Sequence, residues 1–138
     1  AYTDAVMKPL AGFRESLYKE LLSRIKETDE SVPYQYRGWW YYTRDIEGKQ
    51  YPIYCRRKGT MASPEEVMLD VNELAEGKSY TSVDFWEVSP DGNFLAYGVD
   101  FTGYREYTVF IKDLRTGAQG PADPSNWLPA ADGTALAF

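Results

Sequence analysis

The segment WEVSPDGNFLAY (residues 86–97) recurs without gaps as WLPAADGTALAF (residues 127–138). In each copy a tryptophan comes first, Asp-Gly lies at the centre, and a Leu-Ala-aromatic triplet comes last. Asp-Gly between two apolar runs indicates a β-hairpin, because glycine adopts the positive φ that a tight turn requires. The two copies lie 41 residues apart, close to the roughly 40–45 residues of a four-stranded propeller blade. The sequence therefore predicts β-propeller blades.

Further strands are predicted on either side of this repeat. Residues 38–43 (GWWYYT) and 51–57 (YPIYCRR) are rich in β-forming residues and favour a hairpin. The first six residues of the second segment resemble residues 107–112, 56 positions later. Residues 65–69 are compatible with a third strand, and residues 72–76 equally with a helical turn.

The first thirty residues are predicted to form a helix, with Pro9 either in its first turn or breaking a shorter leading helix from the main one. Its apolar residues recur every three or four positions and form a single stripe. They are Leu10, Phe13, Leu17, Leu21 and Ile25. We expect this stripe to pack on another apolar surface, which the sequence does not identify.

These patterns predict a mainly β fold with an N-terminal α-helix, containing about two blades of a partial β-propeller. The expected divisions are a helical lead-in (1–33), an incomplete first blade (34–78), a full blade (79–124) and the start of a further blade (125–138). Closed propellers need about four to eight blades, and the chain does not begin with Met. We therefore expect it to be part of a longer polypeptide. Alone, its unpaired strand edges would favour self-association.

Composition excludes several classes of function. The chain has 138 residues, with 21 acidic against 15 basic side chains, a balance unlike that of nucleic-acid-binding domains. It has no histidine and one cysteine, Cys55, so it can supply neither a Ser-His-Asp nor a Cys-His catalytic set, and no histidine-ligated or multi-cysteine metal site. No catalytic, cofactor-binding or metal-binding residue is expected. Without a signal peptide or a run of about 18 apolar residues, a cytoplasmic protein with no membrane span is expected.

Polar residues in the predicted strands and turns favour structural roles. Ser89 and Asp91 resemble the S-x-D-x-G box of sialidases, but glycine follows the aspartate directly, so a hairpin turn is favoured. The basic run Arg56-Arg57-Lys58 is expected to be a solvated strand end, with Arg56 and Lys58 on the same face. Three carboxylate pairs are expected to lie in charged turns rather than in a glycosidase site. These pairs are Asp45/Glu47, Glu65/Glu66 and Asp84/Glu87.

The aromatic run Trp39, Trp40, Tyr41 and Tyr42 is expected to pack in the core, with a ligand groove as the alternative. Cys55 lies in a predicted strand and has no neighbouring histidine, so a half-buried, unreactive thiol is expected.

Several segments, in order along the chain, resemble oligopeptidase B, a family in the prolyl oligopeptidase group of serine peptidases. They are RIKETD (24–29), SVPY (31–34), GKQYPIYCR (48–56), LDVN (69–72), YREY (104–107) and KDLRTG (112–117). The resemblance extends from about Tyr18 and weakens after Gln119. Residues 118–131, rich in proline and alanine, depart from the family pattern.

The resemblance implies a seven-bladed propeller joined to an α/β-hydrolase domain, cleaving short peptides after Lys or Arg. The propeller would admit peptides and exclude folded proteins. The family's catalytic residues lie in the hydrolase domain, and no position here matches them. The chain is therefore expected to be inactive alone, with that domain and short basic peptides as its partners. Since the repeat also resembles those of TolB-type propellers, a non-enzymatic interaction module is the alternative.

Residues 79–138 contain eight acidic and three basic side chains. Such an excess on a propeller face would attract basic peptides, and reversing the charges of Asp84 and Asp100 is expected to slow their cleavage at low salt. The acidic residues are Asp84, Glu87, Asp91, Asp100, Glu106, Asp113, Asp123 and Asp132.

Overall fold

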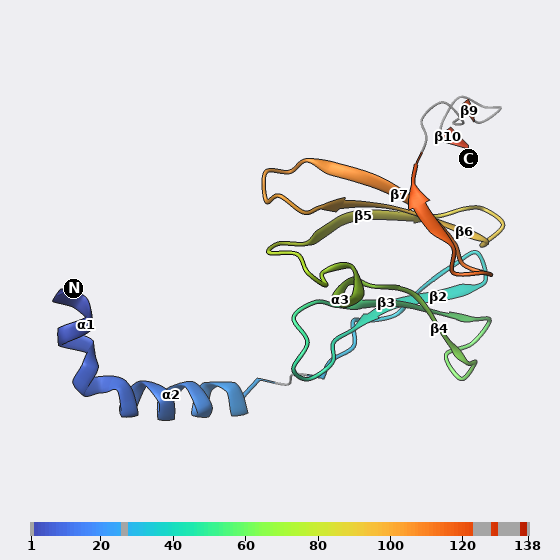
Figure 1. Ribbon diagram of the computed structural model, residues 1–138. Helices are drawn as coiled ribbons and strands as arrows, with labels where there is room; N and C mark the ends of the chain where they lie inside the picture. The colour runs from blue at the N-terminus through green and yellow to red at the C-terminus, as the bar shows by residue number, and fades with distance from the viewer. Residues whose placement is uncertain (1, 26–27, 123–127, 130–135, 138) are drawn as a thin grey trace.

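The computed structural model describes residues 2–25, 28–122, 128–129 and 136–137. Two four-stranded antiparallel sheets pack face to face, and an N-terminal helical segment extends away from them (Figure 1). The mainly β fold with an N-terminal helix is as the sequence predicts.

The first sheet has the strand order β1-β2-β3-β4. Its strands are β1 (Tyr34–Tyr36), β2 (Trp39–Arg44), β3 (Ile53–Lys58) and β4 (Glu65–Asp70), followed by the short helix α3 (Val71–Leu74). Where an incomplete blade was predicted, the sheet has four strands. The additional strand β1 pairs with β2 through a two-residue turn, in which Arg37 and Gly38 have φ of 48° and 80°. Arginine at the first of these positions gives no turn signal in the sequence.

The second sheet repeats this order as β5-β6-β7-β8. Its strands are β5 (Ser82–Val88), β6 (Phe94–Asp100), β7 (Tyr107–Asp113) and β8 (Gln119–Pro121). The segments that resemble each other at an interval of 56 residues therefore include β3 and β7, the third strands of the two sheets.

The 41-residue repeat is present as a second antiparallel strand pair with the same register. The short strands β9 (Leu128–Pro129) and β10 (Leu136–Ala137) are antiparallel. Their pairs Ala137↔Leu128 and Leu136↔Pro129 correspond to Ala96↔Glu87 and Leu95↔Val88 between β6 and β5. Trp127 and Phe138, the outer residues of the second copy, lie outside the described residues.

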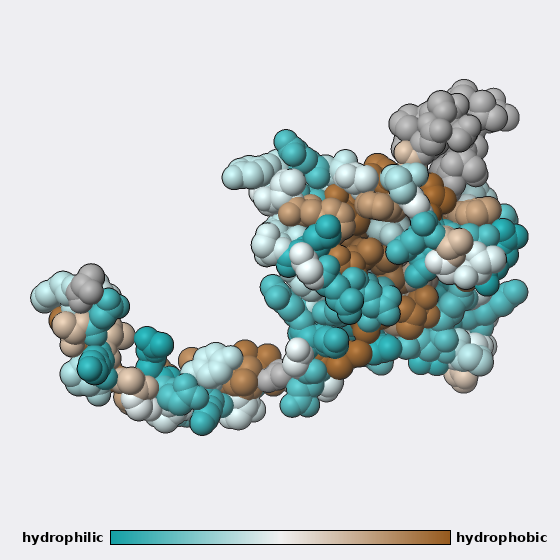
Figure 2. Space-filling view, viewed as in Figure 1, coloured by the Kyte–Doolittle hydropathy of each residue, from teal (hydrophilic) through white to brown (hydrophobic). Residues whose placement is uncertain are grey.

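The main core lies between the two sheets, where Figure 2 shows a band of apolar side chains. Alternation along each strand sends every second side chain into this layer. The buried residues are Tyr41, Met68, Leu69 and Val71 from the first sheet and its helix, and Val88, Leu95, Tyr97 and Val99 from the second. A smaller cluster of Tyr42, Ile53 and Cys55 lies apart from it. Burial of Tyr41 and Tyr42 confirms the core role predicted for these two aromatics.

The N-terminal segment is helical, as predicted, and it is interrupted at Pro9, which was one of the two alternatives. It consists of α1 (Tyr2–Met7), the 3-10 turn η1 (Lys8–Leu10) and α2 (Ala11–Ser23). Pro9 lies in the turn, where its missing N–H group prevents a continuous α-helix. All residues of the predicted apolar stripe are exposed, from 40% at Leu17 to 66% at Phe13. Within the described chain the stripe therefore does not have the apolar partner we expected. No helix in that part is long and apolar enough to cross a bilayer.

Candidate functional site

A buried arginine joins the two sheets. Arg56 lies in β3 and is only 3% exposed. Its Nη1 atom donates to the carbonyl oxygen of Gly92, in the turn between β5 and β6, at 2.7 Å. Its Nη2 atom donates to Glu66 Oε1 in β4 at 2.6 Å, and its Cζ atom lies 3.9 Å from the ring centroid of Trp39. A planar guanidinium suits this combination of stacking and directed donation. The predicted solvated strand end is therefore wrong for Arg56, because its acceptor comes from 36 residues further along the chain.

The other two basic residues of the run lie where alternation places them. Lys58 shares the face of Arg56, with its Nζ atom 5.6 Å from the Trp39 centroid, and is exposed. Arg57 is half-buried and donates to the hydroxyl of Tyr42 at 2.8 Å and to the carbonyl oxygen of Ser63 at 2.6 Å.

Glu65 is the acceptor at the centre of a polar cluster in the first sheet. Its carboxylate accepts hydrogen bonds from the hydroxyl of Tyr42 at 2.6 Å and from Nε of Arg44 at 3.1 Å, with Arg57 3.6 Å away. Burial by itself raises the pKa of Glu65, but the bond from Tyr42 and the charges of Arg44 and Arg57 outweigh it, and the pKa is lowered. Burial and the bond to Glu65 raise the pKa of Tyr42 to about 12. Glu65 is therefore an ionised acceptor.

Stability is expected to fall at acidic pH because of Glu65. Its pKa is lower in the folded state than the usual 4.5, so the folded state binds this proton less readily than the unfolded state. The stabilisation is therefore complete above the unfolded pKa and is lost as pH falls through the folded pKa. We expect Glu65→Gln to weaken the dependence of the free energy of unfolding on pH, measured by urea unfolding between pH 7 and pH 3. Equal pH dependence of the two proteins would contradict this assignment.

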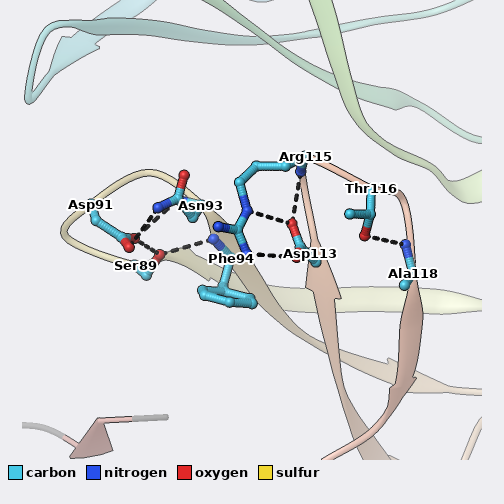
Figure 3. Close-up of polar contacts among 8 residues, drawn as sticks. All are labelled: Ser89, Asp91, Asn93, Phe94, Asp113, Arg115, Thr116 and Ala118. Carbon is cyan, nitrogen blue, oxygen red and sulfur yellow. Dashed lines mark hydrogen bonds and ion pairs between the residues drawn. The ribbon is translucent and has the colours of Figure 1, made fainter.

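The turn between β5 and β6 is held by its own side chains (Figure 3). Ser89 Oγ donates to Asp91 Oδ1 at 2.6 Å and accepts from the backbone N–H of Phe94 at 2.9 Å. The amide groups of Asn93 also donate to Asp91, from the backbone at 3.0 Å and from the side chain at 2.7 Å. The bond from Ser89 contributes most to lowering the pKa of Asp91. These bonds confirm the predicted hairpin turn.

A second turn, between β7 and β8, lies beside the first (Figure 3). Arg115 donates to Asp113 through Nε at 3.0 Å and through Nη2 at 2.7 Å, which with the backbone bond lowers the pKa of Asp113 to about 2. The backbone N–H of Leu114 donates to the carbonyl oxygen of Asn93 at 2.8 Å. The β5–β6 turn, whose Gly92 carbonyl accepts the hydrogen bond from Arg56, is thus held to the β7–β8 turn of its own sheet.

Substituting Gly92 is expected to cost more than substituting Gly117. Both glycines have φ of +77°, so alanine costs roughly 1 kcal/mol at either position from backbone strain. At Gly92 the added Cβ would also lie 3.3 Å from Nε1 of Trp39, whereas nothing lies within 4 Å at Gly117. We expect Gly92→Ala to lower the free energy of unfolding by about 2 kcal/mol and Gly117→Ala by about half that amount. Equal losses in urea denaturation would show that the approach to Trp39 has no energetic effect.

Two of the acidic residues expected on a propeller face have partners within the second sheet. Asp84 accepts from Ser82 Oγ at 2.6 Å and from the hydroxyl of Tyr107. Asp100 is only 2% exposed, and three backbone N–H groups of the following loop donate to it. Burial alone raises the pKa of Asp100, but these bonds and the hydroxyl of Thr102 lower it overall. Asp100 therefore does not belong to an exposed acidic face, and reversing its charge would disrupt the loop.

The remaining candidates from the sequence are placed as follows. Asp45 and Glu47 are exposed in the connection after β2, as expected for a charged turn. The charged-turn prediction is wrong for the other two pairs, because Glu65/Glu66 lie in β4, where they bind different arginines, and Asp84/Glu87 lie in β5. No group of three or more Cys, Asp or Glu side chains in the described part is arranged to hold a metal ion. Cys55 is 0% exposed, more deeply buried than predicted, and burial raises its pKa to about 11. Its thiol is therefore protonated at neutral pH.

An aromatic groove of about 470 Å³ lies between the first strands of the two sheets. The ring of Tyr34 stacks on that of Tyr41 with centroids 5.6 Å apart, and Tyr41 contacts Trp86 at 5.7 Å. The groove is lined by Tyr34, Tyr36, Tyr41, Trp86, Glu87 and Val88. Of the four aromatic residues 39–42, for which a ligand groove was the alternative prediction, only Tyr41 is among the residues that line this groove. Sequence reasoning missed the others, because β1 was not predicted and its residues lie some 50 positions before β5.

Residues 1–130 match the protein family described as the prolyl oligopeptidase N-terminal β-propeller domain. The chain belongs to this family. The propeller inferred from the 41-residue repeat is thereby confirmed.

The chain is also similar to individual proteins that are named as peptidases. The chain is 46% identical to dipeptidyl aminopeptidase BI of Pseudoxanthomonas mexicana, over 94% of its own length and 20% of that protein. It is 38% identical to protease 2 of Moraxella lacunata, over 84% and 18%. Among solved structures it is similar to oligopeptidase B from Leishmania major, with a TM-score of 0.76 and 38% identity over 88% of this chain and 18% of that one. Oligopeptidase B from Trypanosoma brucei, in a closed form with covalently bound antipain, gives 0.70 and 31% over 92% and 19%. The chain spans about a fifth of the length of these relatives.

Proposed function

We propose that this chain is the N-terminal propeller part of an oligopeptidase B-like serine peptidase that cleaves short peptides after Lys or Arg. In that enzyme it forms early blades of a gate that admits short peptides, while cleavage takes place in an α/β-hydrolase domain. The observation that carries the proposal is the similarity to two oligopeptidase B structures over 88% and 92% of the chain. The absence of histidine fits a gating part that is inactive alone.

A second candidate activity is removal of dipeptides from peptide N-termini. It is favoured by the 46% identity to a protein named dipeptidyl aminopeptidase. The non-enzymatic interaction module that the TolB-like repeat suggested is less well supported, since the matched family is named for a peptidase.

The two activities differ in their requirement for a free N-terminus. The experiment uses the full-length polypeptide and a nine-residue peptide with one internal lysine, with its N-terminus either free or acetylated. We expect cleavage after lysine in both peptides, identified by mass spectrometry of the products. Release of dipeptides from the free peptide alone would favour the second activity, and no cleavage of either would overturn the proposal. Replacing the lysine with norleucine is the matched control and is expected to abolish cleavage.

We further propose a cytoplasmic location for the parent enzyme. The single cysteine supports it, because disulfide-bonded domains are typical of oxidising compartments. Fractionation of the producing cell tests the location, and recovery of the enzyme outside the cytoplasm would contradict it.

A further inference from the structure

The groove between β1 and β5 combines exposed aromatic rings with one carboxylate. Tyr34 and Tyr36 are 51% and 48% exposed, whereas Tyr41 is buried behind them. Glu87 is exposed and, among the described residues that line the groove, is the only charged one. Aromatic faces attract cations, and a nearby carboxylate adds to the attraction. The groove therefore has the chemistry of a site for an organic cation.

We propose that this groove is a binding subsite for a lysine or arginine side chain of a peptide, with Tyr34 and Trp86 contacting the cation and Glu87 pairing with it. The inference rests on the proposed function, because the ligands are the basic peptides that the gate admits.

The contact between the two sheets already contains one cation held by an indole ring and a carboxylate. The guanidinium of Arg56 lies over the indole ring of Trp39, 3.9 Å from its centroid, and pairs with the carboxylate of Glu66. In the groove, Trp86 supplies the indole and Glu87 the carboxylate. The first site is filled by the chain's own side chain, whereas the groove lining, as far as the structure describes it, includes no cationic side chain.

Neighbouring groups determine where the incoming cation can lie. The guanidinium of Arg37 lies over the ring of Tyr36, with Cζ 5.0 Å from its centroid, and lines the adjacent pocket. A second cation is therefore better placed toward Tyr34, on the side away from Arg37. Burial, followed by the neighbouring Tyr41 and Glu87, raises the pKa of Tyr34, so its hydroxyl remains a hydrogen-bond donor at neutral pH.

A peptide fits this place better than a free amine. In the described part of the chain, β1 and β5 are the end strands of their sheets. One edge of each therefore presents backbone N–H and C=O groups to which an extended peptide can bond. A side chain in the groove and a backbone along an edge are compatible with one short peptide.

The test measures binding separately from catalysis. The full-length protein is first inactivated at its nucleophilic serine with an organophosphorus reagent. Two probes are then titrated by calorimetry, namely acetyl-Ala-Lys-Ala-amide and its norleucine counterpart, which has a similar length but no charge. Variants Glu87→Gln and Tyr34→Leu test the groove, and Glu47→Gln and Tyr104→Leu, at exposed positions outside it, are the matched controls.

We expect the inactivated protein to bind the lysine probe about five- to thirtyfold more tightly than the norleucine probe. Glu87→Gln and Tyr34→Leu are expected to reduce this ratio to below about threefold, and the controls to leave it unchanged. A ratio of the two affinities near one in the inactivated protein without substitutions would overturn the inference. An unchanged ratio in both groove variants would do the same. Its failure is distinguishable from that of the proposed function, because cleavage after lysine is measured on the active protein with its own substrates.

Discussion

Replacing Arg56 with alanine is expected to lower the free energy of unfolding by about 2–4 kcal/mol, because it truncates a side chain that is 3% exposed and removes its hydrogen bonds, while Glu66, whose side chain is 35% exposed, stays hydrated. The substitution removes the bond to Gly92, the stacking on Trp39 and the partner of Glu66 together. Urea denaturation followed by tryptophan fluorescence measures the loss directly. Trp39 reports on it because its ring lies against the substituted group.

Lys58 provides the matched control for Arg56. It lies on the same face of β3, with its Nζ atom 5.6 Å from the same indole ring, but is exposed. Lys58→Ala is therefore expected to change stability by less than about 0.5 kcal/mol. The double substitution Arg56→Met with Glu66→Leu is expected to recover part of the loss, because methionine fills part of the space that alanine would leave empty. If Arg56→Ala and Lys58→Ala were equally stable, Arg56 would not stabilise the contact between the two sheets.

Replacing Tyr97 with alanine is the second large effect that we expect, with a loss of about 3–5 kcal/mol. Tyr97 is 0% exposed, and its ring stacks on that of Phe110 with centroids 5.6 Å apart. Its hydroxyl also donates to Oε1 of Gln119 in β8 at 2.9 Å. The loss is measured by urea denaturation, as for Arg56.

Two further substitutions separate the contributions of Tyr97. Tyr97→Phe keeps the ring and removes the hydrogen bond, so a loss of about 1 kcal/mol is expected. Tyr104→Ala removes the same side chain at a position that is 83% exposed, and is expected to change stability by less than about 0.5 kcal/mol. A loss below about 1 kcal/mol for Tyr97→Ala would contradict its place at the centre of the core.

Local sequence signals predicted the features that depend on neighbouring residues. Asp91-Gly92 identified a hairpin turn because the backbone geometry is determined by those residues themselves. The repeat at 41 residues identified a second antiparallel strand pair, and its register is reproduced in β9 and β10. Alternation placed Arg56 and Lys58 on one face of β3.

Contacts between distant segments were not predictable in this way. The burial of Arg56 depends on a carbonyl group 36 residues away, which no local pattern reveals. The three charges of Arg56-Arg57-Lys58 therefore led to the prediction of a solvent-exposed strand end. Asp100 was assigned to an exposed acidic face because its three donors are backbone groups, which carry no sequence signal. The aromatic groove was missed because β1 is joined to β2 by a turn with arginine at a left-handed position, which gave no turn signal.

We infer that residues 34–121 form two successive blades of one propeller, joined by Arg56. The most direct test is a crystal structure of the full-length polypeptide. We predict that the two sheets and the sheet containing β9 and β10 are related by successive rotations about one axis, with Arg56 bonded to Gly92. Sheets that share no axis, or a solvent-exposed Arg56, would contradict the claim.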